Sequence, residues 1–424
     1  MRLFIAVALL IITFSIIDCS SSRLSLQNRN VAMLYNPAST NLHPEFFVYH
    51  FNDTSTQVYF RIYTDELLFN KSNMEGEDKA KVRIKYLLFS YGEENKLTDS
   101  SSVTYDIVKK TAGKEYVAFF TIKINSGSYL SMELITTDLL RNSSHLKFIT
   151  VDKKSFFSRQ NFLITVNSKT TPVFNSYLTS NDTVFIKNER AMPASYNVKY
   201  YKEYSLSPLP AFSLTPFRPH EFRSDSTWKM NTDGGILKFC AKYRGIYHLL
   251  ADTSGTIGLT LFNMGEFYPL VRTTSEMIKP IRYITTAKEY KNLTSAKDEK
   301  AAVDSFWLKS SGNINRAKEL IRVYYSRVNF SNIYFTSYIP GWLSDRGMVY
   351  VVFGPPKTIY KDYDNERWIY GDNSNLMSMD FYFQKIDSEF SDNYFVLKRG
   401  EVYKSSWYQA TDTWRNGRIY SVLN

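Results

Sequence analysis

Residues 339–356 read IPGWLSDRGMVYVVFGPP and form the densest run of structural signals in the sequence. Pro340-Gly341 is a break, and Ser344 to Gly347 has the composition of a tight turn, in which hydroxyl and carboxylate oxygens bond nearby backbone N–H groups. Met348 to Phe353 is a short apolar run rich in β-branched and aromatic residues, which predicts a buried strand. The following Gly354-Pro355-Pro356 ends that strand, because proline lacks the N–H group that a β-ladder needs.

This stretch resembles the signature of the GWxTD domain, a family of envelope proteins found chiefly in Bacteroidota and related bacteria. The signature residues here are Gly341, Trp342, Leu343, Ser344 and Asp345, with serine in place of threonine, so the hydroxyl group is kept. Residues outside the signature that also match are Arg346, Gly347, Gly354, Pro355, Pro356, Phe306-Trp307-Leu308, Trp407-Tyr408 and Trp414 to Arg418. The resemblance covers roughly the last third of the chain. It implies an envelope location but no established chemistry.

The N-terminus has the composition of a bacterial lipoprotein signal. Leu3 to Ile17 is an apolar segment of signal-peptide length, and Cys19 follows it at the point where a lipidated first residue would stand. Asp18 departs from the small residue usual before such a cysteine, so an uncleaved anchor and ordinary signal cleavage remain alternatives. No acidic run follows Cys19, which favours the periplasmic face of the outer membrane. A membrane partner through an N-terminal lipid is therefore expected.

Composition limits the class of protein. A chain of 424 residues predicts two or three domains, and 44% hydrophobic with 16% aromatic residues is ample for packed cores. The net charge of +11 is spread along the chain, without the clustering of a nucleic-acid footprint. If Cys19 carries a lipid, Cys240 is the only other cysteine, and we expect it to be a small buried hydrophobic residue.

Most of the chain before residue 273 has the pattern of β-strands. The alternation of Lys81, Arg83 and Lys85 with apolar neighbours has a period of two, which predicts one solvent-exposed and one packed face. Successive segments bounded by turns predict two antiparallel β-sandwiches. The proline-rich stretch from Ser207 to Pro219 is excluded from a central strand and is expected to be a surface loop. The predicted layout is a signal peptide (1–19), a tether (20–43), β-sandwich domains (44–157 and 158–272) and an α+β domain (273–424).

Helical patterns appear in the last of these domains. One helix is predicted over 298–310, with Gly312 closing it and Asn313 capping the next. In that second helix, an apolar stripe is predicted at Ile314, Ala317, Ile321, Tyr324 and Val328. Three short strands near 367–370, 379–383 and 394–397 complete the domain as a small sheet. The predicted fold class is therefore mostly β, with an α+β C-terminal domain.

No catalytic motif, cofactor-binding motif or metal-ligand spacing is found. The five histidines are far apart, and the alternating carboxylates of Asp362, Asp364 and Glu366 lack the turn glycine of a calcium loop, so a solvated loop is expected. Asp345 and Arg346 are the best polar candidates for a site, as a base and an anion clamp. The alternative is that Asp345 and Ser344 satisfy turn backbone and Arg346 pairs locally.

A second candidate patch consists of Trp407, Tyr408, Trp414, Arg415 and Arg418, since tryptophan and arginine are enriched in binding hot spots. Trp407 and Trp414 are seven residues apart, and this spacing fits a buried helix face equally well. From these features we expect a non-catalytic interaction subunit of an envelope assembly, for protein secretion or outer-membrane biogenesis, with other envelope proteins as partners. The alternatives are a glycan- or peptidoglycan-binding module and a hydrolase with an unrecognised site.

Overall fold

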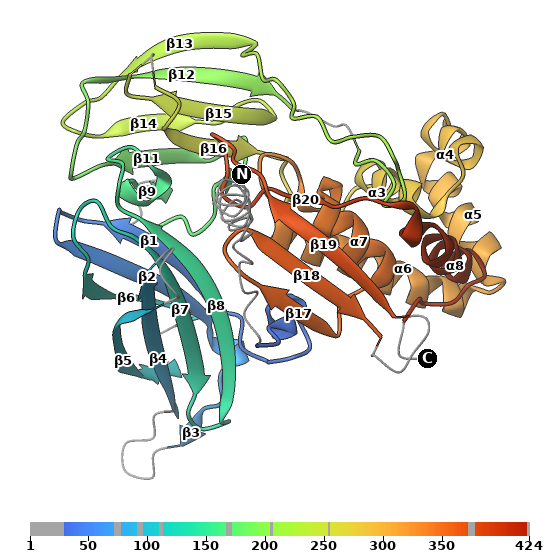
Figure 1. Ribbon diagram of the computed structural model, residues 1–424, viewed down its shortest axis with the longest axis horizontal. Helices are drawn as coiled ribbons and strands as arrows, with labels where there is room; N and C mark the ends of the chain where they lie inside the picture. Colours follow the sequence, from blue (N-terminus) through green and yellow to red (C-terminus); the bar gives the residue numbers. More distant parts are fainter. Residues whose placement is uncertain are drawn as a thin grey trace, which may run out of the picture.

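The computed structural model describes residues 29–71, 78–90, 96–109, 113–166, 172–203, 207–252, 255–371 and 378–421. Two β-rich units and a unit of helices around a small sheet follow one another along the chain (Figure 1). The predicted fold class is confirmed. Among the described residues, no helix has both the length and the apolar character needed to cross a membrane.

The first unit consists of two antiparallel sheets facing each other across an apolar core. One sheet has the order β1-β2-β6, with β1 (Glu45–His50), β2 (Ser55–Tyr63) and β6 (Glu115–Lys123). The other contains β3 (Asn70–Lys71), β4 (Asp78–Ser90), β5 (Leu97–Val108), β7 (Tyr129–Asp138) and β8 (Ser143–Asp152). As predicted, β4 alternates between buried Val82 and Ile84 and exposed Lys81, Arg83 and Lys85. Strand β5 escaped prediction because its Ser- and Thr-rich outer half is exposed and is held mainly by pairing with β4.

The second unit is also a pair of sheets around a core of its own. The larger sheet contains β10 (Tyr177–Leu178), β12 (Ser195–Lys202), β13 (Ser226–Asn231), β15 (Gly245–Leu250) and β16 (Leu259–Asn263). The smaller sheet contains β9 (Leu163–Val166), β11 (Thr183–Lys187) and β14 (Leu237–Cys240). Cys240 was expected to be buried, but it is exposed, because it follows Phe239 at the end of β14 and its side chain points to the opposite face.

In its described residues, the third unit contains six α-helices and a four-stranded antiparallel sheet with the order β17-β18-β19-β20 (Figure 1). The helices are α3 (Thr274–Ile281), α4 (Ala287–Thr294), α5 (Glu299–Ser311), α6 (Ile314–Phe335), α7 (Asp345–Phe353) and α8 (Lys404–Arg415). The strands are β17 (Thr358–Lys361), β18 (Asn365–Tyr370), β19 (Met379–Lys385) and β20 (Phe395–Leu397). Short 3₁₀ turns are η1 (Ala32–Tyr35), η2 (Thr64–Glu66), η3 (Arg159–Asn161), η4 (Arg282–Ile284), η5 (Gly341–Leu343) and η6 (Glu401–Tyr403).

Helices α5 and α6 meet as predicted. Gly312 ends α5 with a left-handed φ of 74°, and the Asn313 side chain accepts a hydrogen bond from the Arg316 N–H at the start of α6. The apolar stripe on α6 was partly wrong, since Ile314 is 60% exposed and Ile321 is only partly buried. The buried face consists of Ala317, Leu320, Tyr324, Tyr325, Val328, Ser331, Asn332 and Phe335.

The strand predicted over Met348 to Phe353 is wrong, because these residues belong to helix α7. All nine residues of α7 are buried, so the helix has no polar face that would reveal a period of 3.6 residues. Ser344 is the N-cap of this helix, and its hydroxyl accepts a hydrogen bond from the Gly347 N–H at 3.0 Å. What resembled a tight turn in the sequence is therefore a helix start.

The predicted tether over 20–43 does not hold for its described part. Val31 is buried and donates its N–H to the carbonyl of Ile359 at 2.9 Å, which attaches η1 to β17. Tyr35 lies in the core of the third unit and donates its hydroxyl to Glu366 at 2.8 Å. The chain therefore begins its described part by docking on a unit more than 300 residues further along the sequence.

The loop predicted after β12 contains no strand, as expected, but it is more than a surface loop. Residues 207–223, which we call the strap, cross from the second unit to the third (Figure 1). Ala211 is buried in the core of the third unit and accepts a hydrogen bond from the Gly400 N–H at 3.2 Å. Phe212 packs on Tyr408, with ring centroids 5.5 Å apart. The strap therefore joins the two units.

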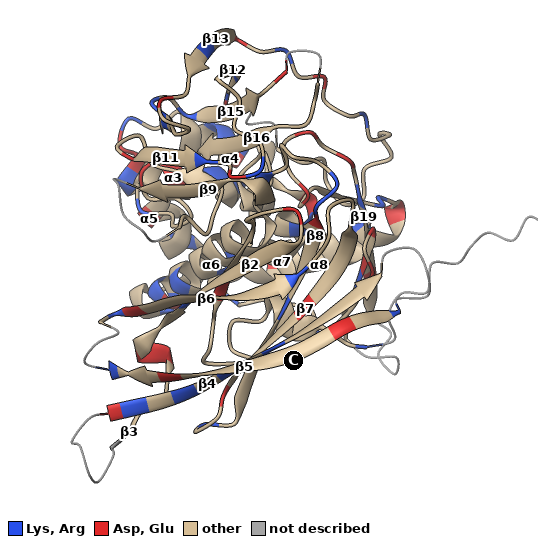
Figure 2. Ribbon diagram, turned by 90° about the vertical axis from the view of Figure 1, so that its left-hand side faces the viewer, with Lys and Arg blue, Asp and Glu red and all other residues tan. Residues whose placement is uncertain are grey.

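Basic and acidic residues are interspersed along the ribbon in Figure 2. Strand β4 carries both signs, and Lys81 pairs with Asp106 of β5 at 3.8 Å. Apart from the exposed Lys81, Arg83 and Lys85 of β4, this distribution agrees with the spread of charge predicted from the sequence.

Two buried histidines predict that stability falls in mild acid. Burial lowers the pKa of His50 and of His248 to about 4, against about 6.5 in an unfolded chain. The unfolded state therefore binds protons more readily between pH 6.5 and 4, and each site removes about 3 kcal/mol of stability across this window. Urea unfolding midpoints should fall as pH decreases from 7.5 to 4.5, and replacing both histidines with Gln should reduce this slope, with a remainder from His145, whose pKa burial lowers to about 3. A midpoint that rises on acidification would contradict the assignment.

Candidate functional site: the signature segment and the junction pocket

The signature segment runs from Pro340 through η5 into α7 and packs against α6. Asn332 of α6 holds it by accepting the Trp342 N–H at 3.1 Å, while its amide group donates to the Pro269 carbonyl at 2.8 Å. The hydroxyl of Tyr283 donates to the Trp342 carbonyl at 2.8 Å. The backbone of the signature is thus fixed from both sides by side chains of other elements.

Both glycines of the segment lie where a side chain has no room. A Cβ atom on Gly341 would overlap the carbonyl oxygen of Ser331 on α6, and one on Gly347 would overlap the carbonyl oxygen of Gly341. The obstacles are backbone atoms, which cannot rotate away. The glycines therefore allow α6, η5 and α7 to approach one another closely.

Asp345 connects the signature to the strap. Its carboxylate accepts hydrogen bonds from the Leu397 N–H at 2.7 Å and from the guanidinium of Arg399 at 2.5 and 2.9 Å. Arg399 also donates to the Leu209 carbonyl of the strap at 3.2 Å. Burial raises the pKa of Asp345, and the Arg399 charge partly offsets this effect. Asp345 therefore positions the arginine that holds the strap.

Replacing Asp345 with Asn should loosen the strap. Asn presents only one oxygen and no charge to Arg399, so the bidentate ion pair is lost and the guanidinium no longer fixes Leu209. We expect amide hydrogen exchange over residues 207–223 to become about tenfold faster or more, with a stability loss of about 2 kcal/mol. Asp412→Asn, at an exposed position on α8, is the matched control and should change neither. Unchanged exchange in the strap would show that Asp345 does not hold it.

Arg346 is fully buried in the third unit. One guanidinium nitrogen contacts the Glu366 carboxylate at 2.9 Å, and the other contacts the side-chain oxygen of Asn393 at 2.5 Å. The group also lies over the rings of Phe335 and Phe395, at 5.0 and 4.1 Å from their centroids. The sequence suggested that Arg346 binds an anion. In the structure, the carboxylate that it binds belongs to Glu366 of the same chain.

Glu366 is the centre of this buried cluster. It accepts hydrogen bonds from Tyr35, Arg346 and Trp368 at 2.8 to 2.9 Å and forms a further ion pair with Lys361. Burial alone raises the pKa of Glu366, but the charges of Lys361 and Arg346 and the hydrogen bonds outweigh burial and lower the pKa to about 2. The solvated loop expected over 362–366 is therefore wrong for Glu366, which is buried as part of β18, the strand that follows the turn.

The other predicted site residues take structural positions. Gly354 ends α7 with a φ of 86°, Pro355 is exposed and Pro356 is buried. Trp407 and Trp414 lie on the inner face of α8, and the indole N–H of Trp414 donates to the Val352 carbonyl at 2.9 Å. The hot-spot interpretation of these two tryptophans is wrong, since both are buried. Arg415 pairs with Glu289 of α4 at 2.6 and 3.0 Å. Cys19 lies outside the described residues.

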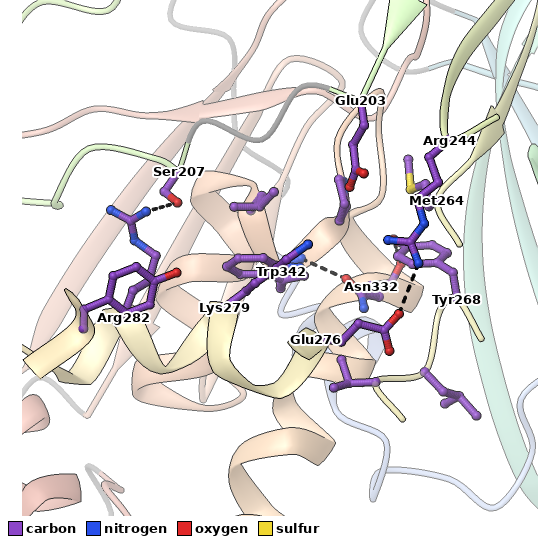
Figure 3. Close-up of a pocket in the computed structure, with 15 residues that line it drawn as sticks. Glu203, Ser207, Arg244, Met264, Tyr268, Glu276, Lys279, Arg282, Asn332 and Trp342 are labelled. Atoms are coloured by element: carbon purple, nitrogen blue, oxygen red, sulfur yellow. Dashed lines mark hydrogen bonds and ion pairs between the residues drawn. The ribbon is translucent and has the colours of Figure 1, made fainter. Parts of the chain in front are cut away.

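A small cavity, which we call the junction pocket, lies where the second and third units meet. It has a volume of about 200 Å³, and Trp342 and Leu343 of the signature form part of its wall. Figure 3 shows Glu203 and Arg244 on one side and Ser207 and Arg282 on the other. Its other lining residues are Met264, Tyr268, Leu270, Val271, Glu276, Lys279, Tyr290, Asn332 and Pro340.

Sequence reasoning missed Glu366, Arg399 and Tyr35 as partners of the signature, and also the junction pocket. These residues are brought together by the third unit's sheet and by the docking of η1, so no local spacing could reveal them. The residues that the structure describes contain no group of His, Cys, Asp and Glu arranged to hold a metal ion. His50 bonds Thr56 and Asp152, and His248 bonds Thr260 and Thr256, away from Asp345 and Arg346.

These features define a β-rich protein whose C-terminal α+β unit is built around a buried Gly-Trp-x-Ser-Asp segment. Residues 245–416 match the model of the GWxTD domain. This part of the chain is therefore similar to the GWxTD domain. The match begins in β15, so two strands of the second unit's larger sheet lie inside the matched range rather than before a boundary at 273. No curated protein matches the sequence.

Proposed function

We propose that this protein is a lipid-anchored lipoprotein on the periplasmic face of the outer membrane, and that it acts as a non-catalytic interaction subunit of a cell-envelope assembly. The proposal rests on the contacts that the charged residues of the signature make. Asp345 and Arg346, its two charged groups, are engaged in buried intramolecular ion pairs with Arg399 and Glu366. The motif thus acts as a joint that holds the strap, η1 and the helices together.

The joint supports a scaffolding role because it connects all three units. The apolar core of the third unit takes in Leu146 of the first unit, Ile246 and Phe262 of the second, and Tyr35 of η1. A packed arrangement of this kind presents surfaces from several units in a fixed relation, which suits binding to large partners. The lipid part of the proposal is supported by the apolar segment from Leu3 to Ile17 and by Cys19.

The test is purification of the tagged protein from gently solubilised native membranes, with mass spectrometry of the protein and its companions. We expect a stoichiometric set of envelope proteins and a lipid-modified N-terminal peptide beginning at Cys19. Cys19→Ala should release the protein from the membrane fraction, whereas Cys240→Ala, at the chain's other cysteine, should not. A protein that purifies alone would contradict the assembly role, and an unmodified Cys19 would contradict the anchor.

A second candidate function, glycan binding, is favoured by an aromatic patch on the second unit. Tyr243 is 61% exposed and Trp228 is 37% exposed, and the Tyr200 ring centroid lies 6.4 Å from that of Tyr243. Exposed aromatic rings of this kind can stack on sugar rings. Co-sedimentation with purified cell-wall sacculi tests the idea: the double variant Tyr243→Ala, Trp228→Ala should lose binding, while Tyr408→Ala, at an exposed tyrosine on α8, should keep it. Equal sedimentation of both variants would remove this candidate.

A further inference from the structure

We propose that the junction pocket receives an anchor from a partner protein: one apolar side chain with a carboxylate beside it, either an acidic side chain or a chain end. This inference rests on the proposed function, since it names the place and the chemistry of a protein contact. Three properties of the pocket carry it: its size, its fixed apolar wall and the distribution of charge on its rim.

The size suits a single side chain. The cavity of about 200 Å³ is smaller than the roughly 300–1,000 Å³ typical of sites for drug-sized molecules. Its lining combines Met264, Leu270, Val271 and Leu343 with the aromatic Trp342. Protein interfaces commonly place one buried apolar or aromatic anchor in such a pocket. The volume therefore favours an anchor residue over a large ligand.

The wall that the anchor meets is preformed. Trp342 is only 9% exposed, its backbone is held by Asn332 and Tyr283, and its ring packs edge-on against Tyr283 at 5.9 Å. A side chain that is already fixed loses little conformational entropy when a partner binds. The pocket can thus accept an anchor without rearranging the signature.

The rim carries two cations without a carboxylate partner among the described residues. Arg244 is paired with Glu276 at 3.5 Å. Arg282 donates to the uncharged hydroxyl of Ser207, and the exposed Lys279 forms no hydrogen bond or ion pair with any residue that the structure describes. Glu203 lies on the Arg244 side of the cavity, away from Arg282 (Figure 3). A single carboxylate on the incoming segment is therefore complementary to the Lys279 and Arg282 side.

The first test uses blocked dipeptides as probes on the full mature chain, with binding followed by ligand-observed NMR. N-acetyl-Leu-Asp-amide should bind about fivefold more tightly than N-acetyl-Leu-Asn-amide, since one exposed charge pair contributes up to about this factor. The double variant Lys279→Glu, Arg282→Glu should remove this preference. The matched control Lys309→Glu, Lys318→Glu, at exposed positions on α5 and α6, should retain it.

A second variant separates shape from charge. Leu270→Trp fills the pocket while leaving every rim charge in place, and it should abolish binding of both dipeptides; a thermal unfolding curve checks that the variant is folded. Equal affinity for the Asp and Asn dipeptides, or unchanged binding to Leu270→Trp, would overturn the proposal. If phenylacetate binds as tightly as the Asp dipeptide, the site is one for small organic acids and the partner-protein anchor is wrong.

The two proposals can fail separately. If Lys279→Glu, Arg282→Glu still purifies with the full set of envelope companions, the interaction function stands and the pocket is not its contact. If the wild-type protein purifies alone but binds the Asp dipeptide selectively, the pocket chemistry stands and the assembly role fails.

Discussion

Gly347→Ala should destabilise the protein by about 3 kcal/mol, although alanine is the better helix former. Helix propensity alone favours alanine over glycine by about 1 kcal/mol within α7. Against this gain, the new methyl group would overlap the carbonyl oxygen of Gly341, and that oxygen belongs to backbone held against α6. Forcing groups into a packed core costs about 1–3 kcal/mol and sometimes more, so the clash outweighs the propensity. The measurement is the free energy of unfolding in urea.

The control for this prediction is Gly400→Ala. The nearest atom to a Cβ at Gly400 is Cγ1 of Val402 at 3.8 Å, an ordinary contact, and the backbone there is extended. Its unfolding free energy should stay within about 0.5 kcal/mol of the wild type. Gly341→Ala should resemble Gly347→Ala, because its methyl group meets the backbone of Ser331. Wild-type stability in both signature variants would show that the glycines do not set the approach of α6, η5 and α7.

Glu366→Gln should be more damaging, at about 3–5 kcal/mol. The substitution keeps the shape but removes the charge that balances Arg346, which is fully buried and has no other carboxylate among its described contacts. Breaking a buried pair by removing one partner leaves an uncompensated charge, and this is where the large cost arises. Because Tyr35 donates to Glu366, amide exchange around η1 should become faster as well.

Two comparisons isolate the charge effect. Lys361→Met removes the other cation, whose side chain is 23% exposed, and leaves the Arg346–Glu366 pair intact, so its cost should be about 1 kcal/mol. The double variant Arg346→Met, Glu366→Leu removes both buried charges and should be more stable than Glu366→Gln alone. If Glu366→Gln costs no more than Lys361→Met, the buried pair is not the main contribution.

The sequence predicted strand β4 and the junction between α5 and α6, where one face of each element is exposed to solvent. Strand β4 and the junction between α5 and α6 follow from alternating polarity, a C-terminal glycine and a capping asparagine. In α7 every residue is buried, so the sequence shows no alternation of polar and apolar residues that would distinguish a helix from a strand. Strand β5 was not predicted for the opposite reason, since its outer half has almost no apolar residues.

The sequence singled out Asp345 and Arg346 but not the residues that they contact. The signature contains Asp345 and Arg346, and the sequence left open whether each serves a site or the local structure. Their partners, Arg399 and Glu366, lie 54 and 20 residues away, and the sheet brings them close. Pairing over such separations depends on strand register and helix packing, which no local motif encodes. The junction pocket depends on two units meeting and was beyond prediction for the same reason.

The docking of η1 also sets how far the protein can stand from a membrane. With Cys19 lipidated, as proposed, Val31, which is fixed on β17, lies twelve positions after the anchor. A chain of that length spans at most about 43 Å. Strand β17 of the third unit and, through the Arg29–Glu133 ion pair, strand β7 of the first unit are then held within this distance of the anchor. A pulling force on the lipid would first meet the ion pair of Arg29 with Glu133 on β7 and the hydrogen bond of Val31 to β17, so the first and third units would share the load before the force reached the Tyr35–Glu366 hydrogen bond.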